Sequence, residues 1–148
     1  MDILFYHMMQ STLEDILPKL VERALACFGR ATIQCVSKEQ RDAIDVRLWI
    51  YADDAFIGHG TECDQYPDLQ PVFITTTQDN PNVSKIRFLV EGAICSDINV
   101  YQRLVVIFDG RNDEQLNLAR MQWKKYKMEN YNLTYWQQTE DRCWKKQI

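Results

Sequence analysis

The chain has 148 residues, of which 46% are hydrophobic and 26% charged, values typical of a globular protein with one core. Its net charge of −4 argues against general binding to a phosphate backbone. The longest apolar runs, such as Leu104–Phe108, are too short to cross a bilayer, and Met1–Tyr6 lacks the basic start of a signal peptide, so we expect a cytoplasmic protein.

The first quarter of the chain predicts a strand followed by a helix. Asp2–Met8 alternates as a strand does, and Ser11 to Glu14 has the pattern of a capping box that begins a helix. Pro18 is expected to kink this helix or delay its regular start, and Gly29 to end it. The helix is predicted from apolar residues at helical spacing, namely Leu13, Ile16, Leu17, Leu20 and Ala24.

The middle of the chain predicts three short strands and a second helix. The β-branched run Ala31–Val36 indicates a strand, and Ser37 with Gln40 predicts the cap of a helix that carries Ile44, Leu48 and Tyr51 on one side. A loop is expected from Ala52 to Gln70. Two apolar strands then follow, separated by a turn at Asn80-Pro81-Asn82, and they cover Val72–Thr76 and Ile86–Val90.

The last third is ambiguous at one place. Val100, Leu104, Ile107 and Phe108 fit a helix that ends at Gly110, although the run Leu104–Phe108 also fits a strand. Asn112 and Gln115 then predict the start of a long final helix that reaches about Glu129. The alternation of strands and helices predicts one α/β domain over residues 1–148, with helices on both faces of a mainly parallel sheet.

The sequence offers no recognisable catalytic or metal-binding motif. The loop after the first strand contains no glycine with which to approach a phosphate, and no Walker A or G-x-S-x-G pattern occurs. The five cysteines form no close pairs, and His59 with Cys63 supplies too few ligands for zinc. Asp109-Gly110 is better explained as turn chemistry than as a catalytic acid. We therefore expect neither an enzyme nor a bound cofactor or metal.

The final helix is the most informative element. From Arg120 onward the chain has seven Lys and Arg against three Asp and Glu, a net +4, whereas the remainder nets −8. At about 100° per residue, five residues share an arc of roughly 100°, namely Leu116, Arg120, Trp123, Lys124 and Lys127. Leu118, Met121 and Met128 lie elsewhere on the helix and are predicted to face the core.

Two interpretations of the cationic and aromatic face remain open. Trp123 packs internally while the lysines only keep the surface hydrated, or the face holds the end of an acidic, aromatic peptide. In the second case Arg120 offers a fork to a terminal carboxylate, and the lysines attract acidic side chains. Trp49 and Phe56 would complete the pocket if the fold brings them close.

These residues resemble the chi subunit of bacterial DNA polymerase III. The likeness runs from Asp2 to about Lys146, and the ending Tyr131–Gln138 is similar to the alphaproteobacterial branch. Its motifs are Phe5-Tyr6-His7, Leu48-Trp49 with Phe56 and His59 behind it, Pro71–Thr76, and Leu118-Ala119-Arg120 followed by Trp123-Lys124. The resemblance implies a Rossmann-like three-layer α/β/α domain without catalytic activity, located with the replisome.

The resemblance also implies partners and site residues. Chi subunits bind the acidic C-terminal tail of single-stranded DNA-binding protein, which ends in Phe, and the psi subunit of the clamp loader. Carried over, Arg120 would hold the terminal carboxylate, Trp49 and Phe56 would line the apolar pocket with Trp123, and Lys124 would meet the aspartates. Lys127 is a further candidate for the electrostatic rim. Two residues depart from the family: Trp123 stands where Tyr is usual, and Leu116 where a lysine is.

Direct binding of single-stranded nucleic acid is the alternative function. Lysines surround several aromatic side chains near the C-terminus, and stacking on such side chains is how many single-strand binders work. The proposed stacking platforms are Trp123, Tyr126, Tyr131, Tyr135, Trp136 and Trp144.

Overall fold

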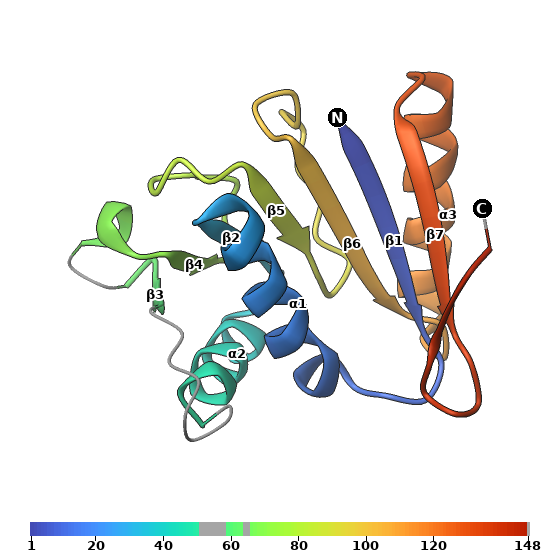
Figure 1. The fold of residues 1–148 in the computed structure, drawn as a ribbon, viewed down its shortest axis with the longest axis horizontal. Coiled ribbons are helices and arrows are strands. Elements are labelled where there is room, and N and C mark those ends of the chain that lie inside the picture. Colours follow the sequence, from blue (N-terminus) through green and yellow to red (C-terminus); the bar gives the residue numbers. More distant parts are fainter. Residues whose placement is uncertain (51–58, 64–65, 148) are drawn as a thin grey trace.

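The computed structural model describes residues 1–50, 59–63 and 66–147, which form a mixed α/β structure (Figure 1). The elements in chain order are β1 (Asp2–Met8), α1 (Leu13–Phe28), β2 (Ala31–Gln34), α2 (Lys38–Ile50), β3 (His59–Thr61), a short 3-10 helix (Pro67–Leu69), β4 (Val72–Thr75), β5 (Ile86–Leu89), β6 (Arg103–Asp109), α3 (Asp113–Met128), β7 (Asn132–Gln138) and β8 (Trp144–Lys146).

The eight described strands form one sheet in the order β3-β4-β2-β5-β6-β1-β7-β8. All neighbours are parallel except β7 and β8, which pair antiparallel. β1 lies between β6 and β7, so that Phe5 pairs with Val106 on one side and with Tyr135 on the other. The expectation of an α/β fold with a mainly parallel sheet is confirmed.

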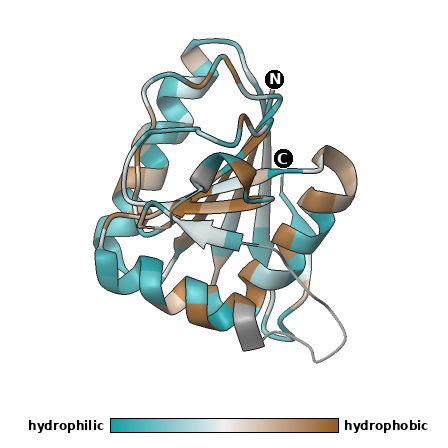
Figure 2. Ribbon diagram, turned by 90° about the vertical axis from the view of Figure 1, so that its left-hand side faces the viewer, coloured by the Kyte–Doolittle hydropathy of each residue, from teal (hydrophilic) through white to brown (hydrophobic). Residues whose placement is uncertain are grey.

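Helices cover the two faces unequally. α1 and α2 lie on one face and α3 on the other (Figure 1), as right-handed crossovers that leave β1 and β6 in opposite directions require. Each face has its own hydrophobic cluster: Leu17 and Ile44 belong to the first, and Ala119 and Tyr126 to the second. Figure 2 shows hydrophobic residues gathered on the central strands and hydrophilic residues on the outer turns of the helices.

The predicted helix boundaries are mostly confirmed. The amide of Gln40 donates to Ser37 Oγ at the start of α2, and the amide of Gln115 donates to Asn112 Oδ1 at the start of α3. Gly29 ends α1 with a φ of 78°, a conformation that suits glycine. The cap of α1, however, lies one residue later than predicted: the amide of Thr12 donates to Asp15 Oδ2. α1 also runs through Pro18, which therefore does not delay the start of the helix.

The helical interpretation of the apolar run before Gly110 is wrong. The predicted inward direction of two methionines in the final helix is also wrong. Arg103–Asp109 is the strand β6, because a continuous apolar run suits a strand that is covered on both faces. Met121 and Met128 do not face the core: they are 67% and 84% exposed. The inward side of α3 is instead built from Ala119, Gln122 and Tyr126, about one third of a turn away.

Strands β3, β7 and β8 are not among the predicted elements. β3 lies inside the segment predicted to be a loop, and Tyr51 and Phe56 lie outside the described residues. β7 lies between β1 and β8, and β8 forms the edge of the sheet. The mixed polar and aromatic sequences of both strands lack the apolar runs of the central strands.

The end of β7 is tied to the loop after β1 by one buried side chain. Gln138 Oε1 accepts hydrogen bonds from the amides of Met9, Gln10 and Ser11 at 3.1, 2.8 and 2.9 Å, and Gln138 Nε2 donates to Ser11 Oγ at 2.8 Å. A single amide group thus satisfies three backbone donors just before α1 begins. This bond set fixes the position of β7 beside β1.

Replacing Gln138 by Ala should lower the free energy of unfolding by about 2 kcal/mol, because the loop amides lose their acceptor. The measurement is urea denaturation followed by circular dichroism. Gln137→Ala is the control, since Gln137 makes no hydrogen bond through its side chain to a described residue, and it should change stability by less than about 0.5 kcal/mol. An equal loss in both variants would contradict the role of the Gln138 amide.

Candidate functional site: an aromatic pocket with a cationic rim

A pocket of about 380 Å³ lies between α3 and the edge of the sheet. α3 crosses the sheet face and packs against β6 and β7, so that its outer turns overhang β7. The pocket is lined from α3 by Leu116, Ala119, Arg120, Trp123 and Lys124, from β6 by Phe108, from β7 by Tyr135 and Gln137, and by Gln147 beyond β8. Three of the predicted site residues, Arg120, Trp123 and Lys124, therefore share one cavity.

Aromatic rings form the wall of this pocket. Trp123 makes edge-to-face contacts with Phe5 at 5.2 Å and with Tyr135 at 5.6 Å between ring centroids. Tyr135 also meets Phe108 at 6.2 Å, and its hydroxyl lies 2.6 Å from His7 Nδ1. Trp123 is half-buried and packs against the second hydrophobic cluster. It thus has an internal packing role and also presents a surface to the cavity.

Cations stand at the rim. Arg120 and Lys124 are exposed, and within the described residues no carboxylate forms an ion pair with either. Lys127 lies one turn beyond Lys124 on α3, is exposed and does not line the cavity. This position is compatible with the electrostatic rim predicted for it. Leu116, which replaces the family lysine, contributes to the apolar wall. An apolar cavity beside unpaired cations suits an occupant that is both apolar and anionic.

The charge of Arg120 reaches the floor of the pocket. Burial lowers the pKa of His7, and the neighbouring Arg120 lowers it further, while Asp109 opposes the shift. Burial raises the pKa of Tyr135, against the smaller opposite effect of Arg120. Both effects keep the hydrogen-bonded His7 and Tyr135 pair uncharged near neutral pH. The positive charge of the site is therefore concentrated at its rim.

Trp49 and Phe56 are not joined to this pocket by the described structure. Trp49 lies in the last turn of α2, a helix that packs against α1, β3 and β4 on the other face of the sheet, and its side chain is not described. Phe56 lies outside the described residues. Their part in the site stays a prediction. Phe108, Tyr135, Gln137 and Gln147 line the pocket instead and were not predicted.

The aromatic platform proposed for nucleic acid is divided between the two faces of the sheet. Tyr135 and Trp123 lie with α3, whereas Trp136 points to the other face and contacts Tyr6, as Trp144 also does. Tyr126 is buried, with a ring that packs against Phe5 and Tyr131. The six predicted aromatic residues therefore do not form one stacking surface.

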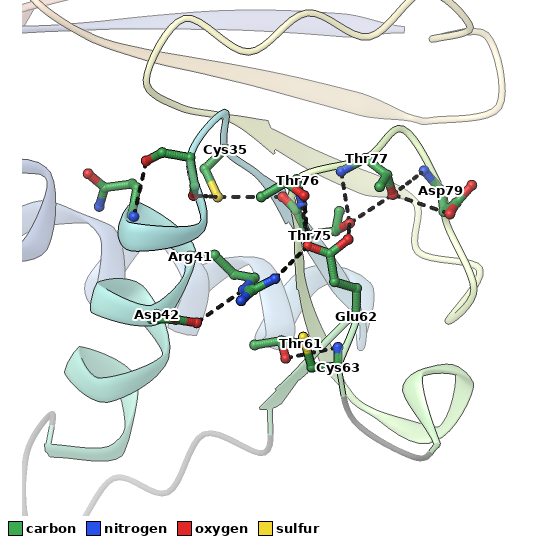
Figure 3. A network of polar contacts seen from close by, with 12 residues as sticks. Cys35, Arg41, Asp42, Thr61, Glu62, Cys63, Thr75, Thr76, Thr77 and Asp79 are labelled. Atoms are coloured by element: carbon green, nitrogen blue, oxygen red, sulfur yellow. Dashed lines mark hydrogen bonds and ion pairs between the residues drawn. The ribbon is translucent and has the colours of Figure 1, made fainter.

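A polar network lies at the carboxyl ends of β2, β3 and β4 (Figure 3). Glu62 accepts hydrogen bonds from Arg41 Nη1 at 2.9 Å and from the Thr76 hydroxyl at 2.7 Å, and Thr75 also donates to it. Burial alone would raise the pKa of Glu62, but these bonds outweigh it and leave the pKa lowered. The polar groups here pair with one another instead of converging on a cavity.

Two other candidates have structural explanations. Asp109 accepts from both the amide and the Nε of Arg111, at 2.9 and 2.8 Å, in a turn before α3. The turn follows the strand β6, so the expectation that Asp109-Gly110 ends a helix is wrong. His59 Nε2 lies 3.1 Å from Asp45 Oδ1. Within the described residues, no group of three or more His, Cys, Asp or Glu side chains is arranged to hold a metal. Nor does any described helix have the length and hydrophobicity needed to cross a membrane.

The fold and the pocket define an α/β domain with Rossmann-like layers that lacks a glycine-rich phosphate loop. Residues 1–134 match the family model described as "DNA polymerase III chi subunit, HolC". The chain is also 24% identical, over 111 residues, to a probable DNA polymerase III subunit chi of Rickettsia prowazekii (strain Madrid E), an alignment that covers 70% of this chain and 67% of the relative. The chain belongs to the DNA polymerase III chi subunit family.

Replacing Arg120 by Gln should raise the pKa of His7 toward its ordinary value of 6.5, because a neighbouring positive charge is lost while burial remains. NMR titration of the His7 ring protons measures this shift. Lys127→Gln removes the same charge about two turns away on α3 and should leave the pKa of His7 unchanged. An identical titration in wild type and Arg120→Gln would show that the guanidinium does not face the pocket.

Proposed function

We propose that this chain is a non-catalytic adaptor of the DNA polymerase III clamp-loader complex that binds the acidic C-terminal tail of single-stranded DNA-binding protein. One observation carries the proposal: Arg120 and Lys124 stand unpaired by described carboxylates at the mouth of a cavity whose wall is aromatic. Such a tail ends in a phenylalanine that carries a free carboxylate and follows a run of aspartates. Its apolar and anionic parts match the two halves of the site.

In this arrangement the terminal phenylalanine of the tail would occupy the cavity. Its ring enters the cavity between Trp123, Tyr135 and Phe108, where burial of aromatic surface and edge-to-face contacts stabilise it. Its carboxylate pairs with the guanidinium of Arg120, a charge-assisted interaction that contributes roughly 1.5–3 kcal/mol. The preceding aspartates lie outside the cavity near Lys124, with Lys127 beyond it on the same helix.

The adaptor role also needs a second contact, with the psi subunit or an equivalent protein of the clamp loader. Membership of the chi family supports this part of the proposal, because a chi subunit belongs to an assembly. The non-catalytic part of the proposal rests on the same family membership. The chain would thus act by linking proteins in the replisome, in the cytoplasm, and would approach DNA only through its partner.

The central test is calorimetric titration with a peptide of the partner's acidic C-terminus. Wild type should bind with micromolar affinity, and Arg120→Ala should bind at least about tenfold more weakly, the equivalent of roughly 1.4 kcal/mol. A peptide without the terminal phenylalanine should show no measurable binding, because it cannot fill the aromatic cavity.

Lys125→Ala is the matched control for this test. Lys125 is an exposed cation on the same helix that does not line the cavity, so its loss should change the affinity less than twofold. Equal weakening by Lys125→Ala and Arg120→Ala would mean that the tail responds only to net charge. No binding of either peptide to wild type would overturn the proposed function.

The salt dependence of peptide binding should distinguish the contribution of the rim cations from that of the cavity. Raising the ionic strength shortens the Debye length to about 10 Å at 0.1 M and screens exposed charges most strongly. The dissociation constant of the full peptide should therefore rise several-fold between low and moderate salt, and Lys124→Ala should show a shallower dependence than wild type. A salt dependence that is unchanged in Lys124→Ala would remove Lys124 from the rim.

A further inference from the structure

The face of the sheet opposite α3 is only partly covered. In Figure 1 the strands β1 and β7 lie to the right of α1, and within the described residues no helix lies over them on the face that α1 occupies. Two adjoining pockets of about 380 and 370 Å³ follow the side of α1, and they share Tyr6, Leu20 and Arg23. Together they form one groove between α1 and the sheet, which runs from β7 and β8 past β1 to β6 and β5 and which we call the α1 groove.

The floor of the α1 groove is apolar and aromatic. Tyr6 of β1 lies parallel to Trp136 of β7, with 6.5 Å between ring centroids, and meets Trp144 of β8 edge to face at 5.1 Å. All three rings are half-buried, and Leu20 of α1 packs beside them. The rings pack against one another, so they present a continuous apolar surface and not separate platforms for stacked bases.

Cations border the α1 groove on both sides. Lys19 and Arg23 lie one turn apart on α1, Arg142 lies in the turn before β8, and all three are exposed. Within the described residues none of them forms an ion pair with a carboxylate. The groove contains one acid, Asp15, whose Oδ2 already accepts from the amide of Thr12 at the start of α1. A chain with net charge −4 therefore carries a local excess of positive charge here.

Arg103 extends this charge along the groove. It is half-buried at the start of β6, with its guanidinium over the ring of Phe28 at 5.4 Å from the centroid. It lines the second pocket beside Leu4 and Val105, where the surroundings are mostly apolar. The groove thus combines an apolar and aromatic surface at Tyr6, Leu20 and Trp136 with basic groups along its borders.

We propose that the α1 groove binds an acidic amphipathic helix of another protein. A helix laid beside α1, at the usual spacing of about 8–10 Å between packed helices, would cover the part of the sheet that α1 leaves open. Its apolar side would pack on Tyr6, Trp136 and Leu20, and its acidic side would face Lys19, Arg23 and Arg142. The site lies on the opposite face from the pocket at Arg120 and does not depend on the tail-binding proposal.

The test uses synthetic peptides of about 16 residues, the length of α1, with leucines at helical spacing on one side. One peptide carries glutamates on the other side, a second carries lysines there, and an oligothymidylate is the third probe. The glutamate peptide should shift the indole N–H signals of Trp136 and Trp144 in NMR spectra and leave that of Trp123 unchanged. The lysine peptide and the oligothymidylate should leave all three signals in place.

Two double charge-reversal variants, one inside the α1 groove and one outside it, give the matched comparison. Lys19→Glu/Arg23→Glu should weaken the glutamate peptide at least tenfold, whereas Lys38→Glu/Lys125→Glu, the same reversal at exposed lysines outside both sites, should weaken it less than threefold. Binding of the partner's C-terminal tail should be equal in wild type and Lys19→Glu/Arg23→Glu, so failure of one proposal is distinguishable from failure of the other. Shifts confined to Trp123, equal binding of the lysine peptide, no binding of the glutamate peptide, or thymidylate shifts at Trp136 would each overturn the proposal.

Discussion

The position of β1 between β6 and β7 is the constraint on which both sites depend. The chain leaves β6, crosses the sheet as α3 and returns as β7 on the far side of β1, and a right-handed crossover in that direction fixes the face on which α3 lies. α1 leaves β1 in the other direction and takes the other face. Parallel pairing on both sides of one strand therefore separates a pocket under α3 from a groove beside α1.

The structure confirms the internal-packing interpretation for Trp123, and the peptide-binding interpretation stays a proposal. Its ring contacts Phe5, which is fully buried, and so belongs to the packing between α3 and the sheet. The same ring forms the wall of the cavity next to Arg120. A rigid aromatic wall that is fixed by core contacts loses little entropy when an apolar side chain packs on it. Internal packing of Trp123 is thus compatible with the proposed peptide-binding role and does not exclude it.

Local patterns predicted the central part of the fold, and tertiary pairing decided the rest. Apolar runs and helix caps predicted β1, β2, β4 and β5 with all three helices, because those elements bury a continuous or periodic apolar surface. β7 is held by parallel pairing with β1 and by Gln138, both contacts between residues far apart in sequence, and β8 pairs with β7 at the edge of the sheet. Tyr135 and Gln147 reach the pocket only through that pairing, so the helical periodicity of α3 could not predict them.

Charge is distributed on this chain in a way that favours acidic partners at defined places. Its acidic total disfavours nucleic acid at long range, while Arg120 and Lys124 on one face and Lys19 and Arg23 on the other make two local positive regions. Each region adjoins an apolar surface, and an acidic segment without apolar residues would gain only screened, exposed charge pairs there. Selectivity therefore requires both features in one ligand. Because the sheet keeps the two regions on opposite faces, the two proposed ligands would not compete for one surface.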